Sequence, residues 1–205
     1  MGKPTRPITL DEFSAMVDTG ILTPDVYSAL YTQLNTGLRI QDVAKMEYDK
    51  IKYGKLELIE KKTGKPQITR INIDVVEFLD KLRITVNNKS KYVFLYDENY
   101  KISSFVRKVQ LQIQSACDYA NIDGTFISTH SFRKAFATKA YEESGRNLIL
   151  VQHLLNHSNV SITQRYINSY QKEIDKFREQ QNSGTDIVYK QLSKIFKKYW
   201  LFSVS

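Results

Sequence analysis

The spacing of apolar residues changes twice along the 205-residue chain, and these changes set the order of its helices and strands. Residues 9–46 and 74–182 carry apolar side chains three or four positions apart, the spacing of amphipathic helices. Residues 48–73 instead alternate apolar and charged side chains, with Gly54 and a TGKP turn at the breaks, as antiparallel strands do. We therefore predict an α+β fold that is mainly α, with a small three-stranded antiparallel sheet.

Several helix ends are marked by residues with capping chemistry. A side chain that accepts a hydrogen bond from an amide of the first turn stabilises a helix start. The predicted starts are Thr9 (with Glu12 at capping-box spacing), Asp74, Ser103 or Ser104, and Ser161 (with Gln164 at the same spacing). Gly37 is expected to end the second helix in the left-handed conformation, which glycine adopts without steric cost.

The composition excludes a membrane-spanning chain and a disordered one. No apolar run approaches the roughly 18 residues that a spanning helix needs. The chain is 41% hydrophobic and 12% aromatic, which is too rich for a segment that stays unfolded. Residues 1–20 contain no apolar segment typical of a secretion signal, and the single cysteine, Cys117, cannot form an internal disulfide. We expect a cytoplasmic protein with no membrane partner.

The charge of the chain is unevenly distributed. The net charge is +8, and residues 61–110 hold 11 basic and 5 acidic residues, an excess of six. A local basic surplus favours a polyanionic partner, because each neutralised phosphate releases counterions. Double-stranded DNA is the predicted partner, with Lys61, Lys65, Arg107 and Lys108 as candidate contacts. Charge alone leaves open the alternative of a basic protein without a nucleic-acid partner.

The residues that could perform chemistry are Arg, His and Tyr rather than metal or nucleotide ligands. The chain has no GK[ST] phosphate loop, HExxH, CxxC or GxSxG motif, so no metal or cofactor is predicted. TGLRIQD places Arg39 near a helix start with Asp42 three residues later, which alone indicates a surface ion pair. THSFRK places His130 and Arg133 one turn apart at a helix N-terminus, where the dipole favours an anion.

Two further segments complete a pattern. LLNHS supplies His157 at the end of one helix, and Tyr166 follows nine residues later. Together with TGLRIQD, a KTG turn between strands and HSFR, these segments resemble, in order and spacing, the catalytic domain of tyrosine recombinases, the phage integrase family. The resemblance extends over residues 9–169.

The resemblance implies a metal-free phosphoryl transfer in which a tyrosine attacks a DNA phosphodiester and leaves a 3′-phosphotyrosyl link. The implied catalytic residues are Arg39, Lys62, His130, Arg133, His157 and Tyr166. The two arginines would clamp the phosphate oxygens, His130 would handle the tyrosine proton, and His157 would donate a hydrogen bond to the phosphate. Lys62 would protonate the leaving 5′-oxygen, with Lys61 and Lys65 as rivals, and Asp42 would orient the cations.

The implied function is that of a site-specific DNA recombinase or integrase of a phage, plasmid or transposable element. Two alternatives stay open. One is a catalytically silent DNA-binding accessory protein on the same scaffold, which is disfavoured because every catalytic position is filled. The other is a nicking-closing enzyme like a type IB topoisomerase, which shares the chemistry. Tyr170 is a rival nucleophile whose spacing from His157 does not fit.

The sequence departs from the family pattern in two places. Asn156 stands where relatives usually have glycine, and we expect the turn to persist because asparagine tolerates the left-handed conformation well. The sequence begins almost directly at the matching region, so we expect the N-terminal core-binding domain of the family to be absent, and DNA binding by the chain alone to be weak and steeply salt-dependent.

The C-terminal segment is expected to form a separate element. We predict a catalytic domain over residues 1–182 and an extension over residues 183–205. Residues 186–200 place apolar side chains on one side of a helix and lysines elsewhere. Such a helix must bury its apolar face, either on its own core or on a neighbouring protomer. The second choice implies self-assembly, as a tetramer on DNA.

Overall fold

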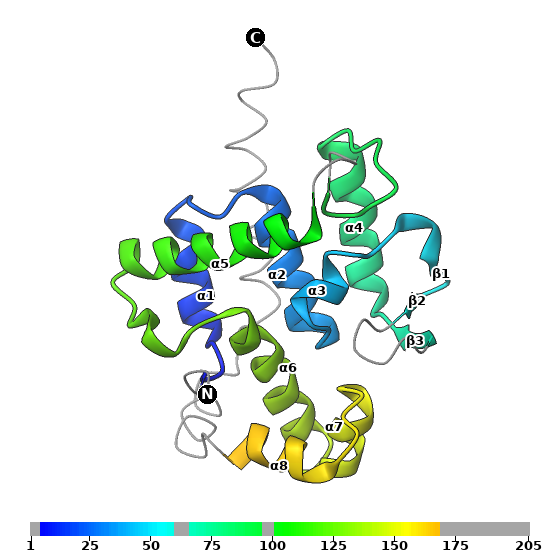
Figure 1. Ribbon diagram of the computed structural model, residues 1–205, viewed down its shortest axis with the longest axis vertical. Helices are drawn as coiled ribbons and strands as arrows, with labels where there is room; N and C mark the ends of the chain where they lie inside the picture. Colours follow the sequence, from blue (N-terminus) through cyan, green and yellow to red (C-terminus); the bar gives the residue numbers. More distant parts are fainter. Residues whose placement is uncertain (1–4, 60–65, 96–100, 169–205) are drawn as a thin grey trace.

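The computed structural model describes residues 5–59, 66–95 and 101–168. The elements in chain order are α1 (Leu10–Asp18), α2 (Pro24–Thr36), α3 (Ile40–Val43), the short 3-10 helix η1 (Tyr48–Lys50), β1 (Ile51–Lys52), β2 (Lys55–Ile59), β3 (Pro66–Arg70), α4 (Ile73–Thr85), α5 (Ile102–Tyr119), η2 (Gly124–Phe126), α6 (Thr129–Glu143), α7 (Leu148–Leu154) and α8 (Val160–Asn168). Figure 1 shows a mainly helical molecule with the small sheet at its periphery, beside α4. The predicted fold class is confirmed.

The sheet has the predicted antiparallel order β1-β2-β3. Lys52 pairs with Lys55 across a two-residue turn formed by Tyr53 and Gly54, and Leu56 of β2 pairs with Thr69 of β3. Leu56 is fully buried, so one face of the sheet packs on the helices while the other faces solvent. The alternation in the sequence therefore predicted the sheet because only one face needs apolar side chains.

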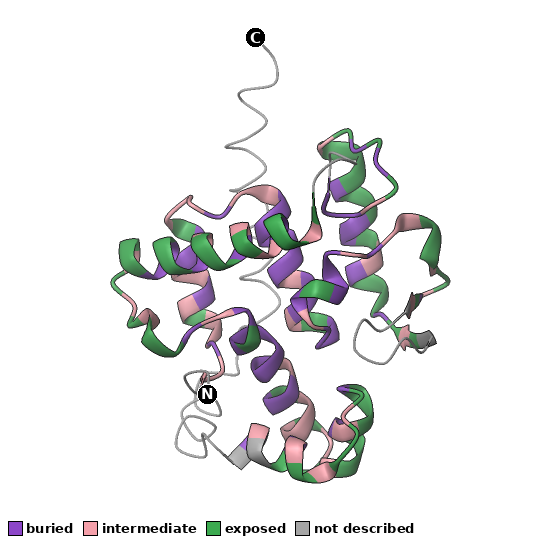
Figure 2. Cartoon of the chain, viewed as in Figure 1, coloured by how far each residue is buried: buried purple, intermediate pink, exposed green. Residues whose placement is uncertain are grey.

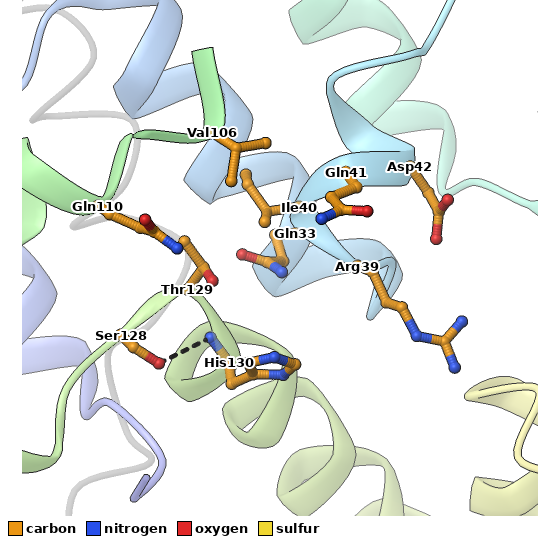
Figure 3. Close-up of a pocket in the computed structure, with 10 residues that line it drawn as sticks. All are labelled: Gln33, Arg39, Ile40, Gln41, Asp42, Val106, Gln110, Ser128, Thr129 and His130. Atoms are coloured by element: carbon orange, nitrogen blue, oxygen red, sulfur yellow. Dashed lines mark hydrogen bonds between the residues drawn. The ribbon is translucent and has the colours of Figure 1, made fainter. Parts of the chain in front are cut away.

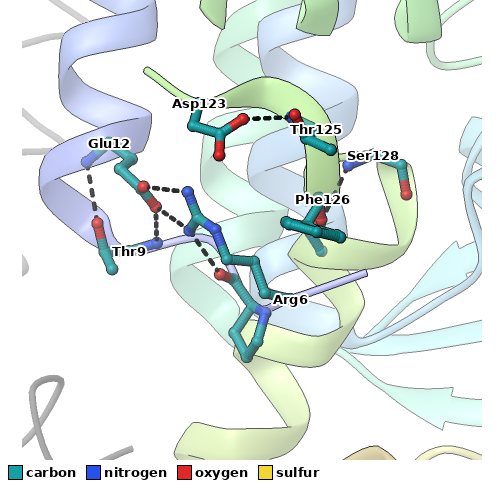
Figure 4. Close-up of polar contacts among 9 residues, drawn as sticks. Arg6, Thr9, Glu12, Asp123, Thr125, Phe126 and Ser128 are labelled. Atoms are coloured by element: carbon teal, nitrogen blue, oxygen red, sulfur yellow. Dashed lines mark hydrogen bonds and ion pairs between the residues drawn. The ribbon is translucent and has the colours of Figure 1, made fainter. Parts of the chain in front are cut away.

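The N-terminus of α1 has the capping box that the sequence predicts. The Thr9 hydroxyl accepts a hydrogen bond from the Glu12 amide at 3.1 Å, and the Glu12 carboxylate accepts one from the Thr9 amide at 2.9 Å. The same carboxylate accepts a hydrogen bond from the Arg6 guanidinium at 2.7 Å, which joins the residues ahead of α1 to its first turn (Figure 4).

Three other helix starts differ from the prediction. The cap of α4 is Asn72, whose side chain accepts from the amide of Asp74, and Asp74 lies in the first turn. α8 begins at Val160, after Asn159 accepts from the Ser161 amide at 2.8 Å. In each case an earlier asparagine has the acceptor geometry, so the helix starts before the predicted cap.

The third correction concerns α5. It begins at Ile102, after Lys101, without a side-chain cap, and the predicted caps Ser103 and Ser104 lie within its first turn. The buried stripe of this helix is nevertheless the predicted one, since Phe105, Val109 and Ile113 are fully buried. None of the described helices is long and apolar enough to cross a membrane.

The buried apolar residues form two clusters of unequal size. The larger cluster contains residues of the five helices from α1 through α5, of the sheet, and of the first half of α6. The smaller has Ala137, Val151, Leu155 and Ile167 at its centre, and it holds α7 and α8 against the second half of α6. α6 is therefore the element that connects the two clusters (Figure 1). Figure 2 shows that most of the first part of this helix is buried.

Gly37 ends α2 as predicted, with a φ of 66°, in the left-handed region. The ring of Phe136 on α6 lies so close that a Cβ added at Gly37 would stand 2.3 Å from its nearest carbon. Glycine is needed here for two independent reasons, conformation and space. This close approach brings the segment after α2 against α6.

Replacement of Gly37 by alanine tests both reasons. We expect Gly37→Ala to lower the free energy of unfolding by about 2–5 kcal/mol, since left-handed strain costs about 1–2 kcal/mol and overpacking about 1–3 kcal/mol. The matched control is Gly145→Ala, because Gly145 has the same φ of 66° but open space around its Cβ position. Urea unfolding of both variants measures the difference, and equal losses would show that the Phe136 contact contributes nothing.

Candidate active site

The N-terminus of α6 presents His130 and Arg133 one turn apart. Ser128 caps this helix, and its hydroxyl accepts a hydrogen bond from the His130 amide at 3.2 Å. The cap fixes the direction in which the first turn leaves the preceding loop. His130 is exposed at this end, whereas Arg133 is buried below it with only 3% of its surface exposed.

Arg133 connects three segments through its guanidinium. It donates to the carbonyl of Gly37 at 2.6 Å and to the carbonyl of Leu155 at 2.7 Å, and it lies 3.3 Å from Nε2 of His157. Burial, with the nearby Arg39 cation, lowers the pKa of Arg133 to about 10, against the opposite effects of Tyr166 and Asp42. Arg133 remains a cation at neutral pH and is held rigidly.

The turn between α7 and α8 places His157. Asn156 has a φ of 50°, so the predicted left-handed turn persists with asparagine in place of glycine. Nδ1 of His157 lies 3.0 Å from the hydroxyl of Thr163, a fully buried residue of α8. This contact fixes the ring, since a histidine held at one nitrogen presents the other in a defined direction.

Tyr166 on α8 completes the cluster. Its hydroxyl lies 3.3 Å from Nδ1 of His130, and its ring meets the His157 ring edge-on at 5.4 Å. Burial raises the pKa of Tyr166 above its usual value of 10, while the charges of Arg133 and Arg39 and a hydrogen bond from Arg133 act to lower it. The phenol is therefore protonated at neutral pH and needs a base to become a nucleophile.

His130 has the properties of such a base. Desolvation lowers the pKa of His130 from its usual 6.5, and the cations Arg133, Lys134 and Arg39 lower it further. The imidazole is thus neutral at pH 7, and one ring nitrogen can accept a proton. Nδ1 of His130 lies 3.3 Å from the Tyr166 hydroxyl, so a small shift of either side chain would bring the two atoms to the distance that proton transfer needs.

A pocket of about 470 Å³ opens beside these residues, between α2, α3, α5 and α6. Figure 3 shows Arg39, at the start of α3, and His130, at the start of α6, on its wall. The remaining lining residues are Gln33, Ile40, Gln41, Asp42, Val106, Gln110, Ser128 and Thr129. Arg39 precedes α3 rather than lying within it, and Asp42 is buried with 6% exposed.

The structure brings most of the predicted residues together. Arg39, Asp42, His130, Arg133, His157 and Tyr166 lie in or beside this pocket. Lys61, Lys62 and Lys65 fall outside the described residues. Arg107 is exposed on α5, whereas Lys108 forms an ion pair with Asp25 at 2.6 Å, so this lysine is already engaged within the chain.

Two residues of the cluster were not singled out from the sequence. Lys134 is 8% exposed, and its ammonium lies 5.0 Å above the ring of Tyr166, a cation–π contact. Thr163 fixes His157. Lys134 directly follows Arg133, which is the only sequence signal for it, and nothing in the spacing identifies Thr163.

A mainly helical domain that gathers two arginines, two histidines and a tyrosine at one pocket has the form of a tyrosine recombinase catalytic domain. Residues 9–173 match the model of the phage integrase family, and the chain belongs to this family. The resemblance inferred from the sequence motifs is therefore confirmed.

Two curated relatives show how far the similarity extends. The chain is 30% identical over 165 residues to tyrosine recombinase XerC of Caldanaerobacter subterraneus subsp. tengcongensis, which covers 78% of this chain and 46% of that protein. It is 26% identical over 133 residues to tyrosine recombinase XerA of Pyrococcus horikoshii, covering 63% of this chain and 45% of the relative. The chain spans about half the length of the curated relatives it matches.

Solved structures share the fold at lower identity. A lambda integrase tetramer bound to a Holliday junction matches with a TM-score of 0.65 and 18% identity, over 82% of this chain and 49% of that one. The crystal structure of XerA recombinase matches with a TM-score of 0.61 and 20% identity, over 88% of this chain and 67% of that one.

The lowered pKa of His130 predicts a pH-dependent stability. Below about pH 6.5 the unfolded chain binds a proton that the folded state resists, so His130 destabilises the fold as the pH falls. We expect the urea midpoint of His130→Gln to decline less than that of the wild type between about pH 7.5 and 5.5. His153→Gln, at an exposed position of α7, is the matched control. Parallel declines in His130→Gln and wild type would contradict the assignment.

Proposed function

We propose that this chain is the catalytic part of a site-specific DNA recombinase of a mobile element, which cleaves and rejoins DNA through a 3′-phosphotyrosyl intermediate. The observation that carries the proposal is the Tyr166 hydroxyl, 3.3 Å from a histidine of lowered pKa and beside the Arg133 guanidinium. On this proposal Tyr166 is the nucleophile, His130 is the base, and Arg133 is the cation that binds the phosphate.

The proposed cleavage step is balanced without an external energy source. The Tyr166 oxygen attacks the scissile phosphorus as its proton passes to His130. The bond from phosphorus to the 5′-oxygen breaks, and Lys62 gives the leaving oxygen a proton. One phosphodiester is replaced by another ester of phosphate, so the freed 5′-hydroxyl can attack the phosphotyrosyl link, release Tyr166 and reverse the step. Strand exchange follows when the attacking 5′-hydroxyl comes from another duplex instead.

Arg39 and Arg133 are proposed to bind the two non-bridging oxygens of the phosphate, where charge accumulates as the tyrosine attacks. Arg133 uses part of its five N–H donors on two backbone carbonyls, and its guanidinium also lies against His157 and Tyr166. His157 adds a hydrogen bond to the phosphate, and the buried Asp42 orients the arginines. Lys61, Lys65 and Arg107 are the proposed DNA contacts around the site, and Lys108 would have to leave its ion pair with Asp25 to join them.

Self-assembly on DNA is part of the proposal. Structures with this fold include a lambda integrase dimer bound to a COC′ core site and XerH bound to a difH substrate. α7 exposes three large apolar residues, Ile149, Leu150 and Leu154, at 60%, 43% and 43%. We propose that residues 1–182 form the catalytic domain and that the apolar side of residues 183–205 docks on a neighbouring copy in a tetramer.

Trapping on nicked duplexes tests the chemistry. A library of duplexes nicked close to each possible cleavage position loses its short product strand, which leaves a covalent adduct that sequencing can locate. We expect wild-type adducts in the presence of chelator, no adducts with Tyr166→Phe, and wild-type adducts with the control Tyr170→Phe. Arg39→Ala should slow adduct formation by roughly 10³ to 10⁵-fold.

The same assay separates the competing activities. Adducts that survive Tyr166→Phe, or that vanish in chelator, would contradict the mechanism. Adducts and plasmid relaxation without a preferred sequence would favour a nicking-closing enzyme over a recombinase. Adducts confined to defined sites, followed by strand exchange between them, are the expected result.

Truncation tests the assembly. A chain that ends at Gly184 lacks residues 186–200, so we expect it to sediment on DNA as smaller complexes than the full chain while it still forms adducts. An unchanged assembly state would instead place the apolar side of this segment on its own core.

A further inference from the structure

The solvent face of the sheet carries a row of three cations that crosses every strand. Lys52 of β1 pairs with Lys55 of β2, and Lys55 pairs in turn with Arg70 of β3. Residues paired directly across antiparallel strands point to the same face, and all three are exposed. Among the described residues none forms an ion pair with any of the three.

This row is unfavourable for the isolated fold. Like charges directly opposite one another destabilise a sheet, and here the same charge is repeated across two neighbouring pairs. The next pair along this face, Glu57 with Ile68, offers one carboxylate, and Ile68 is 66% exposed. The buried face has the opposite character, since Leu56 is fully buried against the core.

The turn next to the row is unfavourable as well. Tyr53 and Gly54 both have positive φ, 51° and 68°, as the two-residue turn of a tight hairpin requires. Asparagine or aspartate is preferred at the first position, whereas a bulky side chain there is strained. The Tyr53 side chain is fully exposed at 101%, so burial within the chain does not compensate for the strain.

Apart from the Glu57 carboxylate, no described residue offsets these costs by an ion pair or by burial, which indicates an external contact. We infer that Lys52, Lys55, Arg70 and Tyr53 form a second DNA-binding surface. This surface binds phosphates of the duplex backbone other than the scissile phosphate. This inference rests on the proposed function. Lysine and arginine neutralise phosphates, and a tyrosine hydroxyl is an established donor to phosphate oxygens.

The dimensions of the row fit a duplex. Neighbouring strands lie about 4.8 Å apart, so the three backbones span about 10 Å. Duplex DNA carries one charge per roughly 1.7 Å of axis, which gives about six phosphate charges over that length. β2 ends at Ile59 and β3 begins at Pro66, so the segment with the proposed catalytic Lys62 is joined to both strands in the sequence, and DNA that Lys62 contacts would lie near the sheet.

Salt-dependent binding of the full chain to mixed-sequence duplex DNA tests the surface. Each phosphate contact contributes about 0.9 to the slope of log affinity against log salt. We expect the triple variant Lys52→Gln/Lys55→Gln/Arg70→Gln to lower this slope by about 2–3 and the affinity by roughly tenfold or more. The charge-matched control is Lys81→Gln/Lys89→Gln/Lys139→Gln, whose positions are exposed elsewhere on the molecule. Its slope should stay close to that of the wild type.

Tyr53→Asn provides a second readout. Asn-Gly suits the turn better than Tyr-Gly, so the Tm should rise, while the affinity for duplex DNA should fall severalfold. The triple variant should also keep or raise the Tm, because the repulsion between its side chains is removed. Loss of binding can then not be attributed to unfolding.

The outcomes are distinct. An unchanged slope in the row variant, or an equal loss in the control variant, overturns the inference, because the second result would reflect net charge alone. Adduct formation by the wild type is measured separately. A chain that forms no adducts but shows the slope change refutes the proposed cleavage and leaves the DNA-binding surface in place.

Discussion

The buried guanidinium of Arg133 is the contact on which the arrangement of the site depends. It bonds the carbonyl at the end of α2 and the carbonyl at the end of α7, so it joins the two helix ends that carry Arg39 and His157. A buried carbonyl left without its donor costs about 1–3 kcal/mol. Loss of the Arg133 side chain would therefore leave both carbonyls without this donor at once. The same residue that is proposed to bind the phosphate therefore assembles the walls of the pocket.

Positive charge is concentrated around the buried cation of Arg133. Arg39 lies near both Arg133 and His130, Lys134 lies near His130, and the carboxylate of Asp42 acts on Arg133 in the opposite direction. Desolvation first, and then these neighbouring cations, lowers the pKa values of Arg133 and His130. Positive charge concentrated in this way attracts anions, which favours phosphate over any neutral ligand.

Local chemistry explains which features could be predicted from the sequence. The capping box at Thr9, the glycine at Gly37 and the alternation around Leu56 depend only on neighbouring residues, and all three were predicted correctly. The caps Asn72 and Asn159 were missed because several polar residues compete at each start, and the path of the incoming chain selects among them. The motifs also named residues that are far apart in the sequence and that the structure places close together, such as His130 and Tyr166, whereas Lys62 lies outside the described residues.

What the sequence could not supply is information about backbone carbonyls and burial. That Arg133 donates to Gly37 and Leu155 depends on where two helix ends point, and no side-chain pattern encodes this. The burial of Lys134, whose ammonium lies over the Tyr166 ring, likewise contradicts the usual exposure of lysine. Both are tertiary properties, and both concern the residues closest to the proposed chemistry.

The small apolar cluster that holds α7 and α8 has a consequence for motion. Its centre is made of four buried residues, so its local unfolding exposes little surface compared with the large core. Tyr166 and His157 are carried on this part, whereas His130 and Arg39 belong to the stable part. Amide protons of α7 and α8 should therefore exchange through partial opening, and Tyr166 can separate from His130 while the rest of the molecule stays folded.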